Sequence, residues 1–320
     1  MKTTLPLLLL ALAAAFPSAQ AQTGKWPDKP VRVVLPFPPG GSTDVVGRLI
    51  AARLSQELDQ QFIIDNRAGA SGIIGTELVV RANPDGYTLL VAPSTYGANA
   101  ALYKLPYDPI KDIATVTRLA TSSFILAVHP SVKATNLKEF IELARAQPGA
   151  LNFGSPGTGS TGHLAAELFR QMTKTNMVHV AYKGEGPAII DLISGQIQLY
   201  FGGPLAMVPQ IKAGKLRGLA VTSEQRFAVM PDLPAITEQV PGYSVIIWYG
   251  MWAPLGTPKD VVLQLNQTIA RILKRPDVQE RLRADGIQDG HTTPEEFSNF
   301  IGREIAKWAE VVKAGNIKVE

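Results

Sequence analysis

Two loops rich in glycine and hydroxyl residues carry the clearest chemical signal in the sequence. They are residues 36–44, PFPPGGSTD, and residues 154–163, GSPGTGSTGH. Each follows a short β-rich run and precedes apolar residues at helical spacing, which predicts a strand-to-helix turn. The unpaired amides and the dipole of a helix N-terminus favour an anion. Because neither loop contains lysine or arginine, we expect neutral donors to hold a carboxylate there.

The candidate ligand-binding residues come from these loops and from the ends of other predicted strands. Tyr182 offers a phenol or a stacking surface, and His163 either touches the ligand or packs inside the protein. If Gly159 adopts a backbone conformation closed to other residues, Gly159→Val is expected to weaken binding more than Thr161→Val; the same argument applies to Gly41. The full set is Phe37, Gly41, Ser42, Thr43, Asp44, Ser94, Thr95, Ser155, Thr158, Gly159, Ser160, Thr161, His163, Tyr182 and Gly203.

Other chemistry is poorly supported by the residue pattern. Gly157-x-Gly159-x-x-Gly162 matches a dinucleotide fingerprint, but residues 178–183, VHVAYK, lack the acidic residue that such a site needs. No two of the four histidines have the i, i+4 spacing of a zinc helix, and cysteine is absent. We therefore predict no cofactor, no metal and no catalytic residue. The competing function is an exported hydrolase that uses Ser155 or Ser160 with His163.

Composition sets the broad class of the protein. The chain has 320 residues, 46% of them hydrophobic and 18% charged, so it forms packed cores, and its length suggests about two domains. The formal net charge is +4 and no run of lysine and arginine is present, which argues against a nucleic-acid partner.

The N-terminus resembles an export signal. Lys2 precedes the apolar stretch 5–16, and Ala19-Gln20-Ala21 is a small-x-small cleavage site. The stretch is too short to span a bilayer. We predict a signal peptide at residues 1–21, cleaved after Ala21, and an exported protein.

The elements that must position the two loops alternate between strand and helix, which predicts an α/β fold with a mostly parallel sheet in each of two lobes. The chain is expected to cross between the lobes twice, near residues 114–122 and 245–253, without a third tether. Lobe 1 would contain residues 22–121 and 247–320, and lobe 2 residues 122–246. Such a hinged clamp closes on a ligand in the cleft.

Several motifs together resemble the Bug family of tripartite tricarboxylate transporter solute receptors. The resemblance covers essentially the whole mature chain. It implies a non-enzymatic periplasmic binding protein in which loops 37–44 and 155–163 hold a ligand carboxylate, partly through water. The implied partners are a small organic carboxylate and the membrane components of a tripartite transporter, and we expect a monomer. The motifs are Pro36-Phe37-x-x-Gly40-Gly41-x-x-Asp44, Asn66-Arg67-x-Gly69-Ala70-x-Gly72, Pro84-Asp85-Gly86-Tyr87-Thr88-Leu89, Tyr182-Lys183-Gly184 and Ala213-Gly214-Lys215-Leu216-Arg217.

Overall fold

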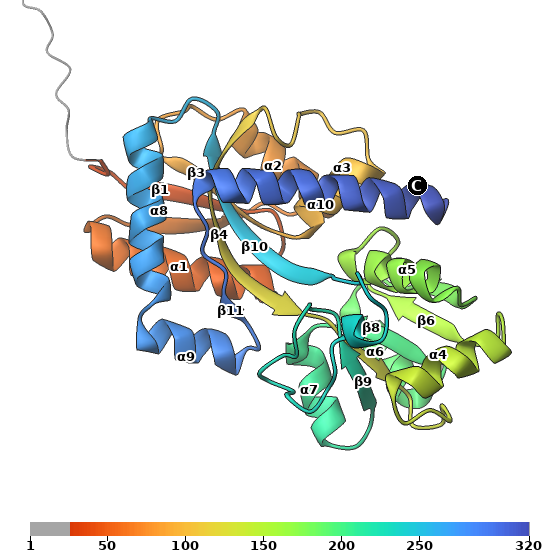
Figure 1. The fold of residues 1–320 in the computed structure, drawn as a ribbon. Helices are drawn as coiled ribbons and strands as arrows, with labels where there is room; N and C mark the ends of the chain where they lie inside the picture. The colour runs from red at the N-terminus through yellow and green to blue at the C-terminus, as the bar shows by residue number, and fades with distance from the viewer. Residues whose placement is uncertain (1–25, 320) are drawn as a thin grey trace, which may run out of the picture.

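The computed structural model describes residues 26–319 and shows two α/β lobes (Figure 1). The predicted signal peptide lies outside the described residues. The strands are β1 (Val31–Leu35), β2 (Phe62–Asn66), β3 (Thr88–Pro93), β4 (Ile113–Ser123), β5 (Ile125–Val128), β6 (Asn152–Ser155), β7 (Val178–Ala181), β8 (Leu199–Gly202), β9 (Arg217–Val221), β10 (Ile246–Pro254) and β11 (Gln288–Asp289). The helices are α1 (Ser42–Leu58), α2 (Ile73–Val80), α3 (Thr95–Leu102), α4 (Leu137–Ala146), α5 (Thr161–Thr173), α6 (Glu185–Ser194), α7 (Pro204–Lys212), α8 (Lys259–Leu273), α9 (Pro276–Ala284) and α10 (Pro294–Ala314), with short 3-10 turns at Ala70–Gly72 and Ile236–Glu238.

Lobe 1 is built on a sheet with strand order β11-β4-β10-β3-β1-β2. Its central strands are buried on both faces, so their side chains alternate between two apolar cores. Val33 and Leu35 pack with α1, α8 and α9, whereas Val34 packs with α2, α3 and α10. Strands β1 to β4 point the same way and only β10 and β11 oppose them, which confirms the mostly parallel sheet predicted for this lobe.

Lobe 2 is built on a sheet with strand order β7-β6-β8-β5-β9. All of its described strands except β5 point the same way. One core contains Phe140 of α4 and Phe169 of α5, and the core on the other face contains Leu192 of α6 and Met207 of α7. The sheet is therefore covered by helices on both sides, as parallel strands require.

The two predicted crossings form a single antiparallel ribbon. Strand β4 pairs with β10 along its whole length, from Ile113 opposite Pro254 to Ser123 opposite Ile246. The ribbon runs from the middle of lobe 1 to the edge of lobe 2, where the chain continues into β5 (Figure 1). A hydrogen-bonded ribbon bends more easily than it shears, which suits a hinge.

Helix α10 makes a noncovalent contact between the lobes that the sequence does not predict, in addition to the two predicted crossings. The C-terminal part of α10 extends beyond lobe 1 and lies over α5 (Figure 1). Trp308 and Val311 of α10 are buried in the same cluster as Phe169 of α5, and Leu102 of α3 packs against that cluster. Gln171 Nε2 also donates to the Val311 carbonyl at 3.0 Å. A noncovalent apolar contact thus joins the lobes in addition to the ribbon. It could not be predicted, because the sequence pattern of α10 does not reveal which lobe its last turns meet.

Val311→Ala tests this contact. Val311 is 3% exposed, so its truncation is expected to lower the free energy of unfolding by about 1–3 kcal/mol. Urea unfolding would measure the loss. The control is Leu263→Ala on α8. Leu263 is 50% exposed, so its truncation should lower the free energy of unfolding by about 0.5 kcal/mol or less. Equal effects of the two variants would contradict the packing of α10 against lobe 2.

Candidate functional site

A cavity of about 550 Å³ lies between the lobes, and both predicted loops reach it. A smaller recess of about 260 Å³ adjoins it and shares Gly41, Ser42, Glu185, Gly203, Ile247 and Tyr249. The other residues lining the main cavity are Phe37, Pro38, Pro39, Thr43, Pro93, Ser94, Thr95, Phe124, Pro156, Ser160, Thr161, Gly162, Gly184, Tyr200 and Phe201.

Five of the described helices begin at this cavity. The residues that cap α1, α3, α5, α6 and α7 all line it: Gly41, Ser94, Ser160, Gly184 and Gly203. This convergence follows from the topology, because the strands before these helices end at the edge of each sheet that faces the other lobe. The first amides of a helix have no partner within the helix, and its dipole is positive at that end. The arrangement concentrates neutral hydrogen-bond donors and positive potential on one space.

The described lining of the cavity offers neutral hydrogen-bond donors and no formal positive charge. Among the described residues that line the cavity and its recess, none is lysine, arginine or histidine. The hydroxyls of Ser94 and Thr161 lie 3.3 Å apart across the lobes. Burial raises the pKa of Tyr249 to about 12, so its phenol beside Ser42 stays a neutral donor. These groups suit a carboxylate, which accepts several short hydrogen bonds.

Asp44 holds the first loop in place from the side away from the cavity. Its carboxylate accepts hydrogen bonds from the Gly40 amide at 3.1 Å, from Arg48 Nε at 2.8 Å and from Asn66 Nδ2 at 3.1 Å. The hydrogen bond from Arg48 holds the pKa of Asp44 below its ordinary value. Asn66 reaches the loop because β1 and β2 are parallel with Leu35 opposite Asn66, and its amide also donates to the Phe37 carbonyl.

A pair of stacked imidazoles holds the second loop. His163 and His179 lie with their ring centroids 3.8 Å apart. His179 Nε2 contacts Ser155 Oγ at 2.7 Å, and His163 Nδ1 accepts from the Gly159 amide at 3.0 Å. Because Nδ1 of His163 is the acceptor, its Nε2–H faces Glu167, 3.7 Å away. These contacts fix the loop at Ser155 and at Gly159.

The structure divides the predicted site residues into two groups. Those lining the cavity are Phe37, Gly41, Ser42, Thr43, Ser94, Thr95, Ser160, Thr161 and Gly203. The others lie outside the lining: Asp44, Ser155, Gly159 and His163 are buried and brace the loops, Thr158 is exposed, and Tyr182 donates its hydroxyl to Asp191 Oδ2 at 2.7 Å. Loop sequence identifies the segment, but not which of its side chains turn toward the cavity.

The two glycines expected to control loop conformation differ from each other. Gly41 has a φ of −80°, which any residue adopts, and a Cβ there meets nothing within 4 Å. Its neighbour Gly40, with a φ of +90°, takes the left-handed conformation instead. Gly159 has a φ of +80°, and a Cβ there would lie 2.7 Å from Leu102 of α3. A side chain at Gly159 would therefore disturb the contact between the lobes.

Sequence reasoning missed two side chains of chemical interest in the cavity. Tyr249 lies within the predicted crossing 245–253, and it is 2% exposed but still reaches the cavity wall. Glu185 lies in Gly184-Glu185-Gly186-Pro187, a run typical of a turn, whereas it is the first residue of α6. The described residues include no group of three or more histidine, cysteine or acidic side chains placed to hold a metal ion.

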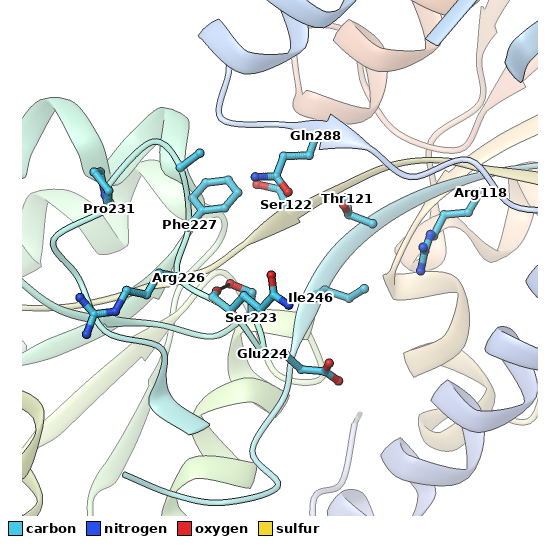
Figure 2. A pocket seen from close by; sticks show the side chains of 12 residues that line it. Arg118, Thr121, Ser122, Ser223, Glu224, Arg226, Phe227, Pro231, Ile246 and Gln288 are labelled. Carbon is cyan, nitrogen blue, oxygen red and sulfur yellow. Dashed lines mark hydrogen bonds between the residues drawn. The ribbon is translucent and has the colours of Figure 1, made fainter. Parts of the chain in front are cut away.

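A second cavity of about 570 Å³ lies along the crossing ribbon (Figure 2). Its walls come from β4, β10, β11 and the segment 223–231 of lobe 2, so it too spans the lobes. None of the described helices begins there, and Arg226 points away from Gln288 and Ser122 (Figure 2) to pair with both carboxylate oxygens of Glu238 at 2.9 Å. This cavity is a groove at the hinge and lacks the converging donors of the first.

Two α/β lobes, a crossing ribbon and a ligand-sized cavity between them define a hinged solute-binding protein. Residues 46–317 match the model of the tripartite tricarboxylate transporter family receptor. The chain belongs to this family, as the sequence motifs predicted. No helix within residues 26–319 has the length and apolar character needed to cross a bilayer.

Relatives resemble the chain over nearly its full length. BugT of Bordetella pertussis is 33% identical over 324 residues, covering 100% of this chain and 99% of its own. A solved periplasmic transporter is 42% identical with a TM-score of 0.80, over 92% of this chain and 100% of its own. R. palustris Rpa4515 with adipate is 38% identical with a TM-score of 0.81, covering 92% and 99%. MatC of Rhodopseudomonas palustris with bound malate is 33% identical with a TM-score of 0.76, covering 90% and 100%.

The imidazole pair makes stability depend on pH. Burial lowers the pKa of His179 to about 4, so the unfolded chain binds a proton more readily than the folded protein between pH 6.5 and 4. The free energy of unfolding should therefore fall as the pH drops through this window. Urea unfolding at several pH values would measure the slope. His179→Gln should flatten it, and an unchanged slope would contradict the assignment to His179.

Proposed function

We propose that this protein is a periplasmic receptor that captures a small organic carboxylate between its lobes and delivers it to the membrane components of a tripartite transporter. The observation that carries the proposal is the convergence of five helix N-termini, from both lobes, on a cavity without a lining cation. The ligand completes the contact between the lobes, which couples capture to closure. Residues 1–21 would direct export and be cleaved off after Ala21, and the receptor would act as a monomer.

The relatives support a carboxylate as the ligand class. Rpa4515 with adipate and MatC with malate each hold a small carboxylate, and they share the fold with this chain at 38% and 33% identity. The choice of carboxylate does not follow from them, since their two ligands differ in length and substitution.

The geometry favours binding over hydrolysis. Ser155 is fully buried, and its hydroxyl contacts His179 and not His163. Ser160 Oγ accepts from the His163 amide at 3.3 Å as the cap of α5. Neither pair presents an activated nucleophile to the cavity, as acyl transfer would require. We expect a carboxylate panel to raise the melting temperature while each compound is recovered unchanged by mass spectrometry; turnover lost in Ser160→Ala would contradict the proposal.

Thr161→Val and Thr158→Val form a matched pair for the binding site. Thr161 lines the cavity and Thr158 does not, although both belong to the same loop. Loss of the Thr161 hydroxyl should weaken binding of the co-purifying carboxylate about 2- to 13-fold, the effect of one neutral hydrogen bond. Thr158→Val should leave the affinity unchanged. Calorimetry would measure both, and equal affinities for the two variants would remove Thr161 from the site.

Closure predicts a change of shape. Since both lobes supply donors to the cavity, saturating ligand should bring them together about the ribbon and reduce the radius of gyration. Small-angle scattering with and without ligand would show the change. An unchanged radius with binding verified by calorimetry would indicate a preformed, rigid cavity.

A further inference from the structure

Glu185 is an acidic side chain in a cavity that otherwise favours anions. It is the first residue of α6 and lines both the main cavity and the adjoining recess. The donors Ser94, Thr95 and Thr161 line only the main cavity. Glu185 therefore stands at the boundary between the donor-rich space and the recess.

The charge of Glu185 has little compensation within the protein. The Gly203 amide donates to its Oε1 at 3.3 Å, and no lysine, arginine or histidine among the described lining residues approaches it. Partial burial raises the pKa of Glu185, while the Gly203 amide and the start of α6 favour the ionised form, and the side chain is exposed to the cavity. The other acidic residue of the recess, Asp285, has a partner in Arg281 at 3.3 Å. Glu185 is the carboxylate left to face a ligand.

A carboxylate at this position discriminates between the far ends of possible ligands. A second ligand carboxylate near Glu185 would meet a like charge, which costs affinity. A protonated amine would meet an opposite charge and a hydrogen-bond acceptor. Specificity arises from this difference, with repulsion as important as attraction.

We propose that Glu185 selects carboxylates that carry a protonated amine, with the ligand carboxylate at the helix N-termini and the ammonium group at Glu185. The proposal rests on the function proposed above and names its substrate class. It assigns Glu185 the role of a specificity-determining residue.

Ligands of equal length that differ in their terminal group separate the effect of a positive charge from that of a negative charge. Calorimetry at pH 7.5 would compare hexanoate, adipate and 6-aminohexanoate, and the four-carbon set butyrate, succinate and 4-aminobutyrate. In the wild-type protein the amino acid of at least one set should bind about tenfold or more tighter than its dicarboxylate. Glu185→Gln should abolish this advantage, weakening the amino acid and strengthening the dicarboxylate. Glu142→Gln on α4 makes the same change of net charge at an exposed site outside the cleft and should behave as wild type.

The outcomes distinguish the two proposals. A wild-type preference for the dicarboxylate, or the same ranking of ligands in Glu185→Gln, would overturn the role of Glu185 and leave the receptor function intact. The receptor function itself would be contradicted by a general failure to bind. In that case wild type, Glu142→Gln and Glu185→Gln would bind no carboxylate of either set and not the compound that co-purifies.

Discussion

The structure is organised around one constraint: a cavity whose described lining lacks lysine and arginine can bind an anion only through neutral donors. A neutral site needs many donors at fixed positions, because each contributes only about 0.5–1.5 kcal/mol. Strand-helix units supply them economically, since every helix that begins at the edge of a sheet brings unpaired amides to that edge. Two facing sheets double the number, and five described helices begin at the cavity. The two-lobed fold is thus the means of converging these helix ends.

Fixed donors require rigid loops, and the buried polar groups near the cavity serve that purpose. Asp44 ties the first loop to α1 and β2, while the His163–His179 pair ties the second loop to α5 and β7. These residues have the chemistry expected of binding groups and lie behind the binding surface. Their hydrogen bonds are made within the protein, so they orient the donors that face the cavity.

Much of the fold follows from the sequence because its periodicity is local. Strand β1 and helix α8 can be recognised directly, since one is a buried apolar run and the other has amphipathic spacing. Helix α3 is hard to recognise because TYGANAAL has little amphipathic pattern, and α7 because it contains Pro209. The two anion loops were recognisable for the same local reason. Glu185 and Tyr249 were not, because their exposure to the cavity depends on how two lobes, distant in sequence, face each other.

The lobes are joined by a packed apolar contact as well as by the ribbon. Trp308 and Val311 of α10 share a fully packed apolar cluster with α5. Ala98 and Leu102 of α3 belong to or pack against this cluster, so the buried hydroxyls of Ser94 and Thr161, 3.3 Å apart, continue the same contact toward the cavity. Apolar burial contributes more free energy than a single hydrogen bond. The apolar cluster therefore contributes most to this contact, and a ligand held by groups of both lobes would add to a contact that exists without it.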